Sequence, residues 1–145
     1  MAKSFNSANS KFQKNPSVDP AIASLRIPPH SIEAEQSVLG GLLLDNAAFD
    51  KIADLVGEDD FYRDEHKRIY RQIRKLLERS KPVDVITVAE SLDSAGEGSD
   101  TGGLAYLGEL AANTPSAANI RRYAEIVRER AILRQLVTAG DEIAG

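Results

Sequence analysis

The chain has 145 residues, of which 42% are apolar and 28% are charged, as in an ordinary globular protein. Its formal net charge of −4 argues against a protein that binds nucleic acid over its whole surface, because phosphate binding needs a dense positive face. The absence of cysteine and the presence of only two histidines exclude thiol chemistry and the usual nitrogen and sulfur metal sites.

The first 25 residues are rich in Ser, Asn and Lys and contain no apolar core segment. This composition predicts a disordered polar tail, and it is unlike a secretory signal, which needs an apolar core. No apolar run elsewhere approaches the length that spans a bilayer, so we expect no membrane partner.

Residues 31–43 predict a helix that supplies part of a core. Pro28 and Pro29 disfavour helix before this segment, and Ser31 stands where an N-cap belongs. Glu33 falls in the first turn, where a negative charge suits the helix dipole. The apolar side chains then follow at helical spacing: Val38, Leu39, Leu42 and Leu43.

Two further helices are predicted between residues 49 and 82. Apolar side chains at i, i+3, i+4 and i+7 mark the first, which Gly57 ends: Phe49, Ile52, Ala53 and Val56. The second has an apolar face and a largely basic opposite face, and Pro82 ends it. The apolar face comprises Ile69, Tyr70, Ile73, Leu76 and Leu77. Asp59 and Asp60 are interpreted as the acidic start of this basic helix and not as a catalytic pair.

The stretch VDVITVAESL, residues 83–92, is ambiguous between strand and helix. Its β-branched residues favour a strand. Asp84, however, is a good N-cap, and Val83 with Val88 would form a hydrophobic staple around it. Because no other stretch reads clearly as a strand with which this one could pair, we predict a helix.

A Gly-rich loop over residues 94–103 precedes a short helix that Pro115 ends. The loop is not a P-loop, because the chain contains no Gly-Lys pair, and no strand precedes it as a dinucleotide fingerprint requires. Tyr106 lies off the apolar stripe of the short helix. Its ring is therefore either an exposed binding anchor or a half-buried packing residue.

Residues 119–145 predict one long helix without an internal proline. Such a helix would span about 40 Å, whereas the roughly 90 residues before it should fold into a body about 30 Å across, so the helix should project. A heptad-like seam runs along it: Tyr123, Ile126, Arg130, Leu133, Val137, Gly140 and Ala144. An uncovered apolar seam is unfavourable in water, so we expect another subunit, or a segment beyond this sequence, to cover it. We also expect the chain to be cut from a longer protein.

No residue set for catalysis is visible. His66 lies on or near the buried face of its helix and is interpreted as a packed or hydrogen-bonded core histidine. The arginines of residues 121–134 alternate with Glu125 and Glu129, which favours a solvated, self-paired face over nucleic-acid contact. Arg130 lies in the seam itself, where an arginine usually meets a carboxylate across an interface. The residues alone indicate an all-α interaction module, with a compact domain of about five helices followed by a long projecting helix.

Residues 26–145 resemble the N-terminal domain of bacterial replicative DNA helicases, the DnaB family. Four stretches carry the resemblance in order and with natural spacing: RIPPHSIEAEQSVLGGLLLD, DFYRDEHKRIYRQI, KPVDVITVAESL and GGLAYLGELAANTPSAANIRRYAEIVRERAILRQL. The resemblance implies a globular helical domain over residues 26–115. Residues 116–145 would form the first arm of a dimerisation hairpin, truncated before its second arm, and the ATPase domain would lie outside this sequence.

The resemblance further implies a bacterial cytoplasmic protein that acts at the replication fork within a hexameric ring. The parent protein would unwind DNA 5′ to 3′ with ATP and magnesium. This part would hold no cofactor and would neither hydrolyse ATP nor unwind DNA. Its expected partners are copies of itself, paired through the hairpins into a trimer of dimers, together with primase and a helicase loader. DNA would pass through the full ring and bind this part weakly or not at all.

Two surfaces are expected to meet these partners. The subunit interface is predicted at the seam residues Tyr123, Ile126, Arg130, Leu133 and Val137. Primase contact is predicted at Glu33, Tyr106 and Val137. The alternative interpretation of the same sequence is a stand-alone helical DNA-binding domain that reads duplex DNA through VITVAESLDSAG, residues 85–96, and its neighbours.

Overall fold

The computed structural model of the chain describes residues 27–144, with side chains up to residue 141. The predicted disordered tail over residues 1–25 lies outside the described residues. The described part is built from helices and contains no strand, which confirms the predicted all-α class. Its elements in chain order are α3 (Ile32–Leu44), η1 (Asn46–Lys51), η2 (Glu58–Asp60), α4 (Asp64–Glu78), α5 (Val85–Ser94), η3 (Ser99–Thr101), α6 (Gly103–Asn113) and α7 (Ile120–Ala144).

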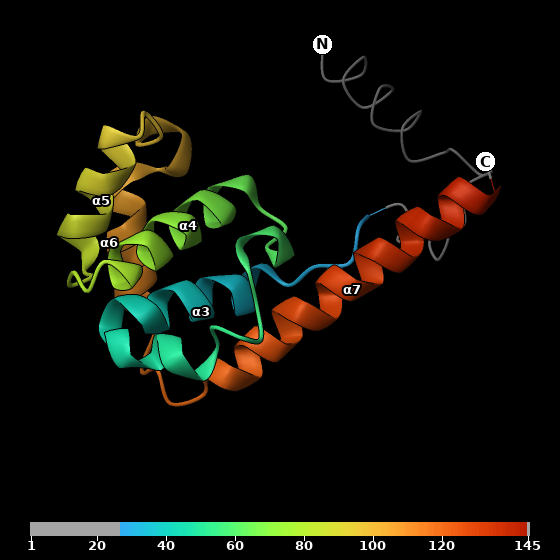
Figure 1. Ribbon diagram of the computed structural model, residues 1–145, viewed down its shortest axis with the longest axis horizontal. Coiled ribbons are helices and arrows are strands. Elements are labelled where there is room, and N and C mark those ends of the chain that lie inside the picture. The colour runs from blue at the N-terminus through green and yellow to red at the C-terminus, as the bar shows by residue number, and fades with distance from the viewer. Residues whose placement is uncertain (1–26, 145) are drawn as a thin grey trace, which may run out of the picture.

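The helix α3 is the centre of the fold. It packs against α4, α6 and the first half of α7, while α5 closes the far side by packing on α4 and α6 (Figure 1). Its apolar side chains Val38, Leu39 and Leu42 are fully buried, as the helical spacing predicted. This helix therefore supplies the core against which the other elements are ordered.

Local capping explains where two of the helices begin. The Ser31 hydroxyl accepts a hydrogen bond from the Ala34 amide at 3.2 Å, as predicted for the N-cap of α3. Asp84 and Thr87 form a reciprocal capping box at the start of α5, and the flanking Val83 and Val88 are both buried. The ambiguous stretch is therefore a helix, because these caps satisfy its first amides and its apolar stripe packs inward.

The segment after α3 differs from the predicted helix over residues 49–56. It forms the short 3-10 helix η1 and then turns, although Ile52 and Val56 are buried as expected. The Asn46 side chain donates to the Val83 carbonyl at 2.8 Å and accepts from the Val83 amide at 2.9 Å. The Asp45 carboxylate accepts from the Ala47 amide and starts the 3-10 turn at once. These bonds hold the segment in a tighter turn than an α-helix.

Asp59 and Asp60 do not start the basic helix, which begins at Asp64. They lie in η2, where the Asp60 carboxylate accepts from the Gly57 amide at 2.8 Å and from Arg128 of α7 at 2.9 Å. Asp60 therefore closes a turn and ties it to α7. A sequence pattern cannot reveal the partner at position 128, because it lies 68 residues away.

The helix α7 projects beyond the body, as its length predicted (Figure 1). Its core-facing stripe consists of Ile120, Ala124, Val127 and Ala131, all buried, and ends at Ala131. The predicted seam lies roughly a third of a turn away from this stripe on an ideal helix. Tyr123 and Ile126 are partly buried, whereas Leu133 and Val137 are 46% and 43% exposed.

Tyr70 makes the stability of the domain sensitive to alkaline pH. Its hydroxyl donates to the Val56 carbonyl at 2.9 Å, and burial raises the pKa of Tyr70 from 10.0 to about 12. Because the folded state holds the proton more tightly, this stabilisation is complete below pH 10 and is lost as the pH rises toward 12, by roughly 2–3 kcal/mol. Urea unfolding between pH 8 and 12 should show this loss. The Tyr70→Phe variant should lose less stability over the same range, and identical slopes would contradict the prediction.

Candidate functional site

A polar groove lies between α3 and α6 and encloses about 350 Å³. It is lined by Glu33, Gln36, Ser37, Tyr106, Glu109, Leu110, Asn113 and Thr114. Its lining residues carry two carboxylates and two side-chain amides, together with hydroxyls of which those of Tyr106 and Thr114 are bonded within the domain, so the groove suits a partner that offers cations and hydrogen-bond donors. Glu33 and Tyr106, which are 73 positions apart in the sequence, are brought together here, whereas Val137 lies on α7 away from the groove.

Tyr106 is half-buried and its hydroxyl points inward. The Tyr106 oxygen lies 2.7 Å from Nε2 of His66 and accepts from the Gln36 amide at 3.2 Å. Its ring stacks against the His66 ring at 5.9 Å between centroids. Of the two predicted alternatives, the structure therefore shows the half-buried packing residue, which also lines the groove.

His66 and Glu35 form a fully buried pair under the groove. His66 has no exposed surface, Glu35 is 1% exposed, and Nδ1 of His66 lies 2.8 Å from the Glu35 carboxylate. This confirms the prediction of a hydrogen-bonded core histidine. Glu35 was not predicted from the sequence, although a charged residue four positions before Leu39, on the apolar face of its helix, was a usable indication of a buried polar contact.

A free apolar face occupies the projecting half of α7. Four large side chains are exposed there, and they are Ile132 at 40%, Leu133 at 46%, Leu136 at 63% and Val137 at 43%. Within the described residues no ion pair with a carboxylate is formed by Arg130, the seam arginine. The face is therefore exposed and apolar, with one arginine at its inner end.

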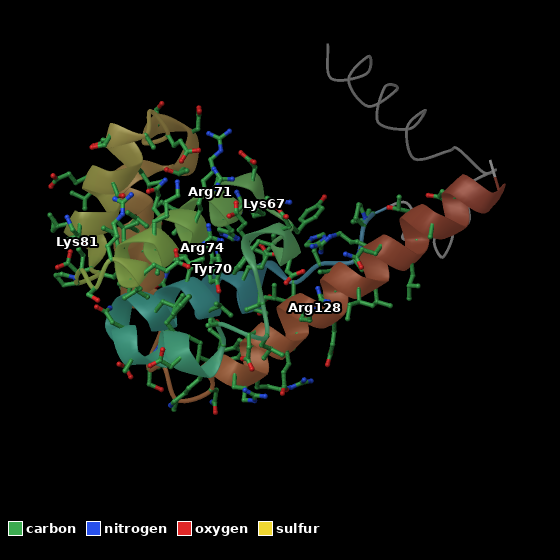
Figure 2. The ribbon with its side chains drawn as sticks, in the orientation of Figure 1. Lys67, Tyr70, Arg71, Arg74, Lys81 and Arg128 are labelled. Carbon is green, nitrogen blue, oxygen red and sulfur yellow. The ribbon has the colours of Figure 1, made fainter. Side chains whose placement is uncertain are left out.

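Four of the five arginines of α7 divide into two groups. Arg121 and Arg122 pair with Glu125 and Glu129 on the helix surface, as predicted. Arg128 and Arg134 instead bind the body, which corrects the reading of one continuous solvated face. Figure 2 labels Arg128 on α7, and its guanidinium reaches the Asp60 carboxylate. Both anchors fix the direction in which α7 leaves the body.

The basic face of α4 is largely neutralised by acidic neighbours. Arg68 pairs with Asp64, Glu97 and Asp100, while Arg71 and Arg74, both labelled in Figure 2, pair with Glu58. Burial alone would raise the pKa of Glu58. The hydrogen bonds and the positive charges of Arg71 and Arg74 lower it by more, so the pKa lies below its ordinary value. The carboxylate is therefore held ionised, and these arginines are occupied in binding α4 to η2 and to the loop before α6.

The described part of the chain holds neither a cluster of metal ligands nor a membrane-spanning helix. Over the described residues, no group of three or more His, Cys, Asp or Glu side chains is placed to hold a metal ion. Between residues 27 and 144 no helix is long and apolar enough to cross a bilayer.

Comparison with known proteins adds the family context. The family model described as the DnaB-like helicase N terminal domain matches residues 27–129. The chain is 49% identical over 128 residues to the replicative DNA helicase DnaB of Haemophilus influenzae, covering 88% of this chain and 27% of the relative. It is 43% identical over 121 residues to that of Geobacillus stearothermophilus, covering 83% of this chain and 27% of the relative. The chain therefore spans about a quarter of the length of the curated relatives it matches.

Solved structures agree with this match. The crystal structure of the N-terminal domain of DnaB helicase from Mycobacterium tuberculosis is 43% identical, with a TM-score of 0.79 over 81% of this chain and 84% of that one. A structure described as a DnaB-like replicative helicase and its interactions with primase is 24% identical, with a TM-score of 0.69 over 79% of this chain and 27% of that one. At that identity the second likeness shows the fold alone.

Proposed function

Because the chain belongs to the family of DnaB-like helicase N-terminal domains, we propose that it is the N-terminal scaffold of a hexameric replicative DNA helicase. The parent protein would unwind DNA 5′ to 3′ with ATP and magnesium bound to a separate domain, at the replication fork in the bacterial cytoplasm. The observation that carries the proposal is the family match over residues 27–129, on a body whose last helix leaves an apolar face uncovered. This domain would serve by presenting surfaces to partners rather than by chemistry.

Subunit pairing is assigned to the seam and the free apolar face of α7. The exposed Leu133 and Val137 continue the line of Tyr123 and Ile126 past the point where the body ends. Burial of such side chains stabilises an interface by about 25 cal/mol for each Å² of apolar surface removed from water. Arg130 would then meet a carboxylate on the facing arm. Pairing of such arms would give the trimer of dimers expected for the N-terminal tier.

We expect Leu133→Asp with Val137→Asp, made in the parent helicase, to weaken subunit association at least tenfold, because two charges would be buried in an apolar interface. Sedimentation velocity across a concentration series measures the shift from hexamer to smaller species. Ile86→Asp is the matched control, since Ile86 is 61% exposed on α5 and lies outside α7. A hexamer unchanged by the double substitution would contradict the assignment.

Primase docking is assigned to the groove beside Tyr106. Glu33 and Glu109 give the groove a negative charge, and Tyr106 adds an aromatic side chain of the kind that dominates binding energies. Val137, the third predicted contact, is placed on the free face of α7 and would touch primase only if primase also reached that arm. A helicase loader is a further expected partner.

We expect the C-terminal domain of the cognate primase to bind this chain, and Glu33→Lys or Tyr106→Ala to weaken that binding at least tenfold, through reversed charge or a lost aromatic contact. Isothermal titration calorimetry measures the affinities. Glu90→Lys is the matched control, because Glu90 is exposed on α5 outside the groove. Wild-type affinity in both groove variants would count against the assigned site, and a lack of wild-type binding would count against primase as partner.

A stand-alone DNA-binding domain remains the second candidate, favoured only by the number of arginines on α4 and α7. Their ion pairs with Asp and Glu argue against it, because paired arginines release few counterions from DNA. A gel shift at physiological salt distinguishes the two functions. Nanomolar binding of duplex DNA would favour the second candidate.

A further inference from the structure

Tyr106 connects the groove to the interior through a chain of hydrogen bonds. The Gln36 amide donates to the Tyr106 oxygen at 3.2 Å, and the same oxygen is hydrogen-bonded to Nε2 of His66 at 2.7 Å. Nδ1 of His66 lies 2.8 Å from the Glu35 carboxylate, so both ring nitrogens of His66 are hydrogen-bonded. Each group therefore holds its neighbour in one orientation.

Glu35 passes the connection on to the backbone between η2 and α4. Its two carboxylate oxygens accept from the Tyr62 amide at 2.7 Å and from the Arg63 amide at 3.3 Å. Glu35 and His66 are almost wholly buried, and no buried side-chain polar atom between residues 27 and 141 lacks a partner. A change at one member would leave a buried polar group unpaired, which is costly, so its neighbours must readjust.

Tyr62 carries the connection to α7. Its ring lies between His30, stacked at 4.2 Å between centroids, and Arg134, whose guanidinium carbon is 5.5 Å from the ring centre. Arg134 also donates to the carbonyls of Pro29 at 2.8 Å and Asp60 at 2.6 Å. It lies just past Ala131, the last buried residue of α7, and so anchors the helix at the point where it leaves the body.

We propose that the relay Tyr106–His66–Glu35–Tyr62–Arg134 couples the groove between α3 and α6 to the orientation of the α7 arm. Occupancy of the groove and pairing through α7 are then thermodynamically linked, and the linkage is reciprocal. The inference rests on the proposed function for the identity of the groove's partner, but the relay itself is a property of this chain. Arg134 and His66 act in it as positioning residues.

The first test needs no partner. The chain contains no cysteine, so spin labels at Glu90→Cys on α5 and Thr138→Cys on α7 report the arm orientation without interference. Electron–electron double resonance should show a shifted or broadened distance distribution in Tyr106→Phe and in Arg134→Gln. Tyr62→Phe, which keeps the stacked ring, and Arg122→Gln, a surface arginine of the same helix, should match wild type. Circular dichroism confirms that each variant is folded. Folded Tyr106→Phe and Arg134→Gln with wild-type distributions would overturn the relay.

The second test uses the C-terminal domain of the cognate primase as the groove ligand. Arg134 lies outside the groove. If the coupling is reciprocal, Arg134→Gln should still change the affinity for primase several-fold, whereas Arg122→Gln should bind primase as wild type does. Primase should also move the label distance in wild type and leave it unmoved in Arg134→Gln. Primase that binds wild type and Arg134→Gln equally, without moving the labels, would overturn the coupling. If primase failed to bind while Tyr106→Phe still shifted the arm, the relay would stand and the proposed function would fall.

Discussion

Leu39→Ala is expected to lower the free energy of unfolding by about 2–5 kcal/mol, a large part of the stability of a small domain. Leu39 is fully buried at the centre of α3, where that helix meets its neighbours. Removal of its isopropyl group loses the transfer free energy of the buried atoms and leaves a cavity that packed helices fill only in part. Urea unfolding followed by circular dichroism measures the effect.

Leu44→Ala is the matched control for this prediction. Leu44 ends the same helix but is 48% exposed, so the same substitution should change stability by less than about 1 kcal/mol. A comparable loss in both variants would show that helix propensity, and not burial, governs α3. A loss below about 1 kcal/mol in Leu39→Ala would refute the central role of α3 in the core.

Gly40→Ala is expected to destabilise the domain by about 1–3 kcal/mol even though alanine favours helices. A Cβ atom at position 40 would lie 2.0 Å from the Thr114 hydroxyl oxygen and 2.6 Å from the Leu110 carbonyl oxygen. The carbonyl belongs to the backbone of α6, so relief requires α6 to move away from α3. Because the groove lies between these helices, the same variant should also weaken primase binding, which calorimetry can measure alongside unfolding.

Gly108→Ala separates this close approach from helix propensity. Gly108 lies inside α6, and a Cβ there meets nothing within 4 Å. The substitution should therefore stabilise the domain by about 0.5–1 kcal/mol. Opposite signs at positions 40 and 108 are the expected result, and destabilisation at both would contradict the explanation by contact.

Capping and periodicity made most helices predictable from the sequence. Ser31 and Asp84 each satisfy an amide within three residues, so their effect is contained in a short stretch of sequence. The apolar spacing of α3 and α4 predicted their buried faces for the same reason. The projection of α7 also followed, because it depends only on helix length compared with the size of the body.

The candidate site was predictable only in part. Glu33 and Tyr106 were named from the family resemblance, but their shared groove depends on how closely α3 approaches α6 at Gly40. The seam of α7 was visible as a heptad pattern. The sequence pattern did not separate this seam from the face of α7 that packs on the body, because the small side chains of Ala124 and Ala131 give a weak apolar pattern.

The sequence by itself determined most of the helices, the caps of α3 and α5, and the arm that extends past the body, because these depend mainly on residues within one or two turns of each other. Tertiary structure alone decided the bonding of Asn46 to Val83 that holds the turn after α3, the pairing of Asp60 with Arg128, and the burial of Glu35 beside His66. Each of these brings together groups more than 30 positions apart. Their energies arise from desolvation and hydrogen bonding that exist only once the helices have packed.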